Sequence, residues 1–339
     1  MKKLLAVAAV VAAVVAVSGT LMAQDRAGGA PPAAGQGRGG GRGGGGGRGM
    51  AQGGSGPIRM LLITKAHPYE REPFYQMFDA LGADITWMHV DHPAAEVFMT
   101  PKYADRYDVL TFYDMNGAQA DLGRSRRVPV NPPNPAVWPN GTKIEVNPPS
   151  ADLQKGFPEL LRQGKGIVFF HHALASWIHS WPEYVEVMGG ACDWGNPINI
   201  RGIQHPQSGF FGMTPQHITV VNKTHPITQG LGDGFDVIDE SYGCPYFEDS
   251  VTPLLRTDFV PADHNRNLSP QYKYSNLAGW VKTAENSPIV YIQMGHGPAV
   301  WGNPMYRKLM GNAIKWAASP EALAWAKANP KRIFKSSTN

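Results

Sequence analysis

Apolar runs separated by amphipathic segments dominate the first half of the folded part of the chain. Residues 58–64 (IRMLLIT), 83–90 (ADITWMHV) and 107–115 (YDVLTFYDM) are rich in aliphatic and aromatic side chains, and GIVFF follows at 166–170. Such runs are typical of strands that are buried on both faces of a parallel sheet. The pattern therefore predicts four buried strands in this half.

Helical spacing separates these runs. In residues 69–83 the apolar side chains recur every three or four positions, as expected for a helix that packs one face on a sheet. Residues 151–163 follow Ser150, which can cap a helix, and end before Gly164. This alternation predicts an α/β fold with a doubly wound, mostly parallel sheet and right-handed crossovers.

The second half of the chain has more β character. Residues 303–317 predict a closing helix and residues 321–329 a short helix in the C-terminal tail. Residues 116–149 are rich in Pro, Asn and Gly and predict a long loop, a kind of segment that often forms a lid or a binding loop. Further strands are predicted at 217–222, 235–242, 252–257, 277–283 and 287–297.

The N-terminal composition predicts export. Residues 1–23 combine Lys2 and Lys3 with an apolar stretch and then small residues, which is the pattern of a cleavable signal peptide; an uncleaved anchor is the alternative. Residues 24–56 are rich in Gly and Arg and predict a disordered linker. We therefore expect one α/β domain at 57–318, a helical tail at 319–339, and a periplasmic or secreted protein without stable membrane insertion after signal cleavage.

The charge of the folded part differs from that of the whole chain. The chain has 31 basic and 27 acidic residues, but residues 1–56 hold six of the basic and one of the acidic ones. The remaining 25 basic and 26 acidic residues nearly cancel. The folded part therefore does not indicate a nucleic-acid partner. Phosphate-binding glycine patterns do not follow any predicted strand, so we expect no nucleotide cofactor.

Two cysteines, Cys192 and Cys244, stand far apart in the chain. Without a C-x-x-C pair, a thiolate zinc site is excluded. In an oxidising compartment the two residues could form a disulfide, and two free thiols are the alternative. The sequence does not predict the oligomeric state.

Histidines stand at the ends of three predicted strands. His67 follows the first strand, His171 and His172 follow GIVFF, and His296 follows the last strand. In a parallel sheet the carboxyl ends of the strands lie along one edge, where ligands bind. Side chains far apart in the sequence can therefore converge there, although each histidine taken alone is explained as a hydrogen-bonded structural residue.

Carboxylates and aromatic side chains add to this edge. Asp239 and Glu240 are adjacent in VIDESYG and precede Tyr242, and Asp114 is near the end of another strand. Imidazoles and carboxylates together can bind a divalent metal ion or act as acid and base. Trp177 and Trp181, four residues apart, are expected either in the core or as the wall of a pocket. The other histidines considered lack ligand spacing and are expected to be surface or structural: His205, His217 and His225.

Four segments resemble the ThuA-like, or trehalose-utilisation, family: RMLLITKAH, GKGIVFFHHA, HPITQGLGDGFDVIDESYG and IVYIQMGHGPAVWGNPMYRKLMGNAIKWA. They occur in family order and cover nearly all of residues 57–318. The resemblance implies a fold similar to the class I glutamine amidotransferases, a flavodoxin-like three-layer α/β/α sandwich. In those relatives a cysteine stands at the elbow after the strand that corresponds to GIVFF. Here His171 and His172 stand there, so amide hydrolysis through a thiolate lacks its nucleophile.

The resemblance implies a set of site residues at the positions that match the family. At one of them this sequence departs from the family, because His172 stands where a small residue is usual. Together with the strand-end pattern, the resemblance leads us to expect catalytic roles for His171, Asp239, Glu240 and His296. Contacts to substrate are expected from His67, Asp114, His172, Trp177 and Tyr242. The cofactor is left open; if a divalent metal is present, its expected ligands are His171, His296 and Glu240.

The resemblance implies a role in the catabolism of trehalose and related disaccharides through 3-keto-sugars. A ketone acidifies neighbouring C–H bonds, so a base and an electrophile suffice for elimination, hydration or isomerisation. An exported enzyme that acts on a small carbohydrate, of lyase, hydratase or isomerase type, is therefore the first hypothesis. A non-catalytic carbohydrate-binding or cell-surface module with the same fold is the alternative.

Overall fold

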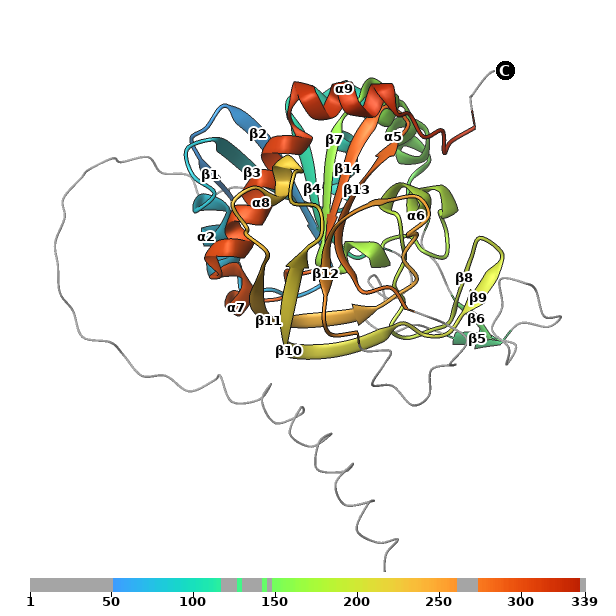
Figure 1. Ribbon diagram of the computed structural model, residues 1–339. Helices are drawn as coiled ribbons and strands as arrows, with labels where there is room; N and C mark the ends of the chain where they lie inside the picture. The colour runs from blue at the N-terminus through green and yellow to red at the C-terminus, as the bar shows by residue number, and fades with distance from the viewer. Residues whose placement is uncertain (1–50, 117–126, 130–141, 145–147, 261–273, 336–339) are drawn as a thin grey trace, which may run out of the picture. The chain divides into compact units, whose positions relative to one another are not determined.

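A ten-stranded sheet forms the centre of the described part of the protein. The computed structural model describes residues 51–116, 127–129, 142–144, 148–260 and 274–335. Within them the strand order is β1-β3-β2-β4-β7-β14-β13-β12-β10-β11 (Figure 1). These strands are β1 Gln52–Gly54, β2 Ile58–Lys65, β3 Ile85–Asp91, β4 Val109–Asp114, β7 Gly166–Phe170, β10 Gly209–Val220, β11 Gly234–Gly243, β12 Thr252–Thr257, β13 Leu277–Ala284 and β14 Ser287–Ile292.

The sheet is parallel in its middle and antiparallel on both flanks. β3, β2, β4, β7 and β14 pair in parallel, whereas β1 and the series β13, β12, β10 and β11 pair antiparallel. The prediction of an α/β fold is confirmed, but that of a mostly parallel sheet is wrong, because the sheet is mixed. A strand such as β13 is buried along its whole length. Such a strand has a continuous apolar run in the sequence whether it pairs in parallel or antiparallel, so the run does not predict the strand direction.

Helices cover both faces of the parallel strands (Figure 1). Successive residues of β2 point to opposite sides, so Met60 packs in a cluster with Phe74 and Leu309, while Leu61 packs in another with Phe157. The first cluster includes residues of α2, α7, α8 and α9, and the second includes residues of α3, α5 and α6. The bounds are α2 Arg71–Asp79, α3 Pro101–Ala104, α5 Ala151–Gln163, α6 Pro182–Met188, α7 Pro298–Trp301, α8 Pro304–Ala317 and α9 Pro320–Ala328, with 3₁₀ turns η1 Ala94–Met99, η2 His171–Ala175 and η3 Pro226–Thr228.

The main helices begin and end at the capping signals that the sequence shows. The Ser150 hydroxyl oxygen accepts the backbone N–H of Leu153 at the start of α5. Gly164 ends the same helix in the left-handed conformation, with φ 94°. The Asn303 side chain accepts two backbone N–H groups at the start of α8. The predictions for these two helices are confirmed.

The folded part begins before residue 57. Strand β1 lies inside the segment predicted as a linker and pairs with β3 at the edge of the sheet. The predicted signal peptide, residues 1–23, lies outside the described residues, as does most of the predicted 116–149 loop. Two small sheets complete the description: β5 Arg127–Pro129 with β6 Thr142–Ile144, and β8 Ile198–Ile200 with β9 Ile203–His205.

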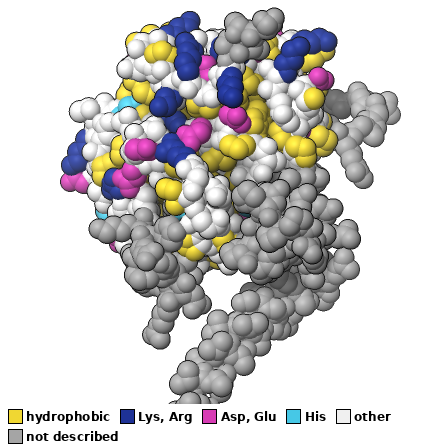
Figure 2. All heavy atoms as spheres, turned by 90° about the vertical axis from the view of Figure 1, so that its right-hand side faces the viewer, with side chains coloured by type: hydrophobic (Ala, Val, Ile, Leu, Met, Phe, Trp, Pro, Cys, Tyr) yellow, Lys and Arg dark blue, Asp and Glu magenta, His cyan; other side chains and the backbone are white. Residues whose placement is uncertain are grey.

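The described surface mixes charges of both signs. On the face shown in Figure 2, Lys and Arg side chains lie next to Asp and Glu side chains, with apolar patches between them. Within the described ranges, no helix has the length and apolar character needed to cross a membrane.

Cys192 and Cys244 form a disulfide, with their Cα atoms 5.2 Å apart. Of the two alternatives left open by the sequence, the structure therefore shows the paired one. The bridge joins the segment after α6 to the residue that follows β11. It thereby ties together two regions that lie close to the strand ends described below.

His225 makes stability sensitive to acid. Its ring packs on Trp316, its Nδ1 accepts the backbone N–H of Ile227, and burial lowers its pKa to about 4. The folded state therefore binds fewer protons than the unfolded state between pH 6.5 and 4, so the free energy of unfolding falls as the pH drops through this window. We expect His225→Asn, which keeps a capping acceptor but does not titrate there, to show a shallower fall in urea titrations. Parallel pH profiles of the variant and the parent protein would contradict this.

Candidate functional site

His171 stands at a sharp turn between β7 and η2. Its φ is 56°, a left-handed conformation that costs a non-glycine residue about 1–3 kcal/mol. The Tyr291 hydroxyl donates to the carbonyl oxygen of His171 at 2.9 Å. In strand-to-helix elbows of this kind the central residue is presented at the strand end and often is a nucleophile. Here that residue is an imidazole.

The turn after β14 brings His296 beside this elbow. Gly295 has φ 150°, and a Cβ on it would lie 3.0 Å from the Cβ of His171, so glycine permits the close approach. The buried Asp239 carboxylate accepts the backbone N–H groups of Gly295 at 2.6 Å and His296 at 3.1 Å. Asp239 was expected to be catalytic; the structure instead turns its carboxylate to the backbone. These two hydrogen bonds hold the backbone turn that carries His296.

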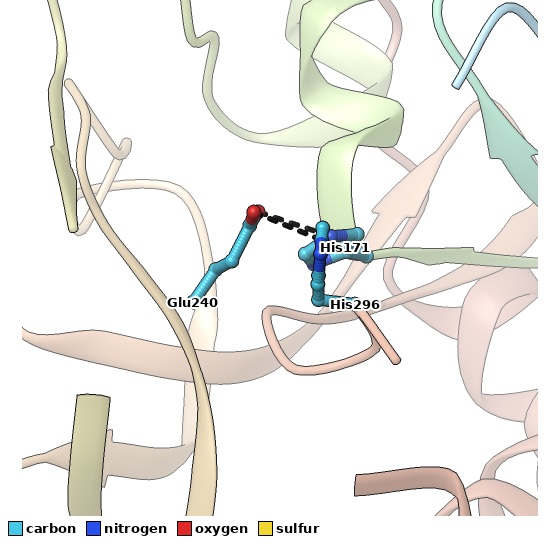
Figure 3. A group of neighbouring side chains, drawn as sticks. All are labelled: His171, Glu240 and His296. Atoms are coloured by element: carbon cyan, nitrogen blue, oxygen red, sulfur yellow. Dashed lines mark ion pairs between the residues drawn. The ribbon is translucent and has the colours of Figure 1, made fainter. Parts of the chain in front are cut away.

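Glu240 joins the two histidines (Figure 3). Its Oε2 lies 3.3 Å from His171 Nε2, and its Oε1 lies 2.9 Å from His296 Nδ1. The Tyr242 hydroxyl donates to Glu240 Oε2 at 2.6 Å and lies 2.9 Å from His171 Nε2. The structure thus brings together side chains from the ends of β7 and β14 and from β11, as the convergence hypothesis requires.

Glu240 is held ionised in this cluster. Burial alone would raise the pKa of its carboxyl group, but the hydrogen bonds from His171, His296 and Tyr242 outweigh burial and hold the pKa well below its usual range. Burial likewise would lower the pKa of His296, but its hydrogen bond and charge interaction with Glu240 raise it above the ordinary value. The two groups therefore stabilise each other's charged forms, the Glu240 carboxylate and the His296 imidazolium.

His67 and His172 line the same site. The ring centre of His67 lies 4.7 Å from that of His172 and 5.2 Å from that of His296. Burial and then the charges of His171 and His296 lower the pKa of His67 to about 4. Burial also holds the pKa of His172 well below its usual value, and its Nδ1 lies 3.4 Å from the Asp114 carbonyl oxygen. Both rings are therefore uncharged at neutral pH.

Two residues expected to contact substrate lie elsewhere. The Asp114 carboxylate is buried and accepts the Ser176 hydroxyl at 3.1 Å, with His92 Nε2 at 3.4 Å. Trp177 is 3% exposed and packs on Trp181 in the core. These contacts of the Asp114 carboxylate and Trp177 do not involve His171, Glu240 or His296, and their expected substrate contacts stay predictions. Trp181 is buried as well, so of the two alternatives left open for Trp177 and Trp181 the structure shows the core.

Three aromatic residues near the site were not predicted. Tyr113 packs on His171 and His172, with ring centres 5.7 and 4.2 Å apart. Trp194 and Phe210 both contact the ring of Tyr242. Tyr113 could have been found because it is adjacent to a strand end in the sequence. Trp194 and Phe210 carry no such local signal, since a disulfide and strand pairing bring them there.

The donor set fits a divalent metal ion. His171, Glu240 and His296 each offer one ligand atom, and these atoms all lie within 4.8 Å of one another; among the described residues they form the one group of this kind. Two imidazole nitrogens, one carboxylate oxygen and an open position are the ligand set of catalytic zinc sites. The observation that supports the fit is the ionised carboxylate placed between the two imidazoles.

Comparisons with known proteins show the family of the chain. The sequence profile of the ThuA family, described as trehalose utilisation, matches residues 134–317. A ThuA-like protein from Parabacteroides merdae has a similar structure, with a TM-score of 0.53, 14% identity, and 78% of this chain and 90% of that chain covered. A ThuA-like protein from Bacteroides uniformis gives a TM-score of 0.50 and 15% identity, with 78% and 92% covered. At these identities the likeness shows the fold alone. No curated protein matches the chain.

Proposed function

The chain belongs to the ThuA, or trehalose utilisation, family, and from this premise we propose that it is an enzyme that acts on a sugar or a 3-keto-sugar in disaccharide catabolism. The catalytic centre is the cluster of His171, Glu240 and His296. The observation that carries the proposal is the convergence of these three side chains around one ionised carboxylate. The proposed reaction class is elimination, hydration or isomerisation.

Elimination and isomerisation begin with removal of a proton from the carbon next to the ketone, and hydration, the reverse of elimination, ends with return of a proton to that carbon. His67 is the acceptor, because its low pKa leaves it uncharged at neutral pH and its ring lies against His296. A low pKa also makes His67 a weak base, so the carbonyl group must supply much of the driving force. Tyr242 fixes the Glu240 carboxylate, and Asp239 holds the turn that carries His296.

His171, Glu240 and His296 would hold a divalent metal ion such as zinc. When bound, such an ion supplies a Lewis acid that polarises the ketone oxygen and acidifies the neighbouring C–H bond. The chain's own contribution is to keep Glu240 ionised and both imidazoles oriented. The Gln293 carbonyl oxygen, 3.2 Å from His171 Nδ1, orients His171, the Tyr242 hydroxyl holds Glu240, and Asp239 holds the turn that carries His296.

Glutamine amidotransferase chemistry is not part of the proposal. Its thiolate nucleophile has no counterpart, because both cysteines of the chain are joined in a disulfide and the elbow residue is His171. We also propose that the fold is the flavodoxin-like three-layer type, since helices pack on both faces of the parallel strands. The same disulfide supports our proposal that the protein is exported to the periplasm or secreted, because such bonds persist in oxidising compartments.

We expect the purified full-length protein to contain about one divalent metal ion per chain, since the site offers one set of three converging donors. Elemental analysis measures this directly. His171→Ala should lose the metal. His217→Ala should keep it, although it removes another imidazole paired with a carboxylate, Asp236, at 2.7 Å.

Measurements of turnover distinguish a metal-dependent enzyme from metal-free acid–base catalysis and from a non-catalytic binding module. Oxidised glucosides carrying a ketone at C3 are offered to the protein with and without a chelator. Turnover by a metal-free protein that ignores the chelator would overturn the metal site and leave acid–base catalysis. Binding of these glucosides without any turnover would favour the non-catalytic carbohydrate-binding module.

A further inference from the structure

Strand β10 carries a β-bulge directly opposite Glu240. The pairing of Phe211 and Thr214 with β11 leaves two residues, Gly212 and Met213, opposite that single glutamate. Met213 has φ 44°, which is unusual for a residue with a side chain. Bulges re-aim side chains and are frequent next to active sites. The bulge therefore changes the direction of β10 where it passes the proposed catalytic carboxylate.

Apolar side chains are exposed around the bulge. Phe210, Phe211 and Met213 are 50%, 47% and 46% exposed. The Phe210 ring lies nearly parallel to that of Tyr242, with centres 6.3 Å apart, and Trp194 contacts the same Tyr242 with centres 4.7 Å apart. Phe211 is opposite Ser241 and packs on Phe259, so it faces away from Tyr242. We call Trp194 and Phe210, the two residues that contact Tyr242, the aromatic rim. Clustered apolar exposure of this kind marks binding surfaces.

The aromatic rim is continuous with the catalytic cluster. The hydroxyl group of Tyr242, whose ring both rim residues contact, donates a hydrogen bond to Glu240. Trp194 is two residues after Cys192, and Tyr242 is two residues before Cys244, so the disulfide fastens the two walls to each other. A binding surface that is already ordered loses less entropy when a ligand binds.

We propose that the aromatic rim binds an aromatic aglycone, so that the substrate is an aryl glycoside whose sugar ring reaches Glu240 and whose aglycone stacks on Phe210. The inference rests on the proposed function and changes its substrate class from disaccharides to glycosides with an aromatic aglycone. Residues 209–214 (GFFGMT) contain no charged side chain. A second sugar ring would bring several hydroxyl groups that need polar partners, whereas an aryl ring needs apolar contact area. The Trp194 indole N–H is buried without a hydrogen-bond partner among the described residues and can donate to an oxygen of the ligand.

Calorimetric binding tests this substrate class. The probes are 4-nitrophenyl and methyl glucosides oxidised at C3, each as both anomers. They are titrated into the Glu240→Gln protein, so that substrate is not consumed. In that background we expect Phe210→Ala to weaken 4-nitrophenyl binding about tenfold and methyl binding less than twofold. Phe210→Tyr, which keeps the ring, should restore the affinity, and Val221→Ala, an exposed apolar residue just after the far end of β10, should change neither.

The outcomes separate this inference from the proposed function. Equal affinity for both probes, equal losses in Phe210→Ala, or no binding of either probe would overturn the aryl subsite. Turnover is measured separately with the Glu240-containing protein. If that protein turns over neither probe but Phe210→Ala still selectively weakens 4-nitrophenyl binding, the subsite stands and the enzymatic proposal fails.

Discussion

His171→Ala and Glu240→Gln are each expected to lower turnover of an oxidised glucoside by about 10²–10⁴-fold. Glu240→Gln keeps the size of the side chain but removes the charge that lies 3.3 Å from His171 and 2.9 Å from His296. His171→Ala removes one of the two imidazoles at the elbow. Steady-state values of kcat and kcat/KM measure the loss. Because the charge is needed where the reaction occurs, we expect the loss mainly in kcat.

Glu248→Gln is the matched control. Its carboxylate pairs with Arg256 at 2.8 Å on the surface, so the variant should keep the parental kcat. The free energies of unfolding and the affinities for unreactive glucosides show whether each site variant stays folded and binds. A Glu240→Gln protein with parental kcat would contradict the assignment of Glu240 to the catalytic centre.

Replacing both Cys192 and Cys244 by alanine is expected to lower the free energy of unfolding by about 4 kcal/mol, because the bridge closes a loop across 52 residues. Loss of the bridge increases the conformational freedom of the unfolded chain. Urea titrations of the two proteins, analysed by linear extrapolation, measure the difference.

The wild-type protein in reducing buffer is the control for this variant, since it loses the bridge without a change in sequence. Its stability should fall to that of the double variant, and the double variant itself should be insensitive to reductant. A loss below about 1 kcal/mol in both proteins would contradict the stabilising role of the bridge.

Much of the strand and helix pattern could be predicted because its causes are local. The run at 58–64 is apolar because β2 is buried on both faces, and Ser150 and Gly164 mark the two ends of α5. The strand-end position of His171 follows from the same reasoning, since the apolar run GIVFF ends there. Site residues that come directly after an apolar strand could therefore be predicted from the sequence.

The direction of the site side chains could not be predicted from the sequence. Asp239 and Glu240 are adjacent in β11, yet one carboxylate holds the 295–296 backbone and the other meets two imidazoles. Which carboxylate meets the backbone and which meets the imidazoles depends on the face of β11 to which each side chain points. The register of β11 against its neighbours decides this. Trp177 was expected to contact substrate because it is close to a strand end, but an aromatic residue in that position can equally pack in the core, as Trp177 does.

The sequence by itself determined the order and extent of most strands and helices, the imidazole in place of a thiol at the elbow, and the family. Only the tertiary structure decided the antiparallel flanks, the pairing of Cys192 with Cys244, the role of Asp239 and the aromatic rim beside Tyr242. The physical reason is the range of the interactions. Burial period and helix capping act between residues a few positions apart, whereas strand direction, register and side-chain convergence depend on partners distant in the chain.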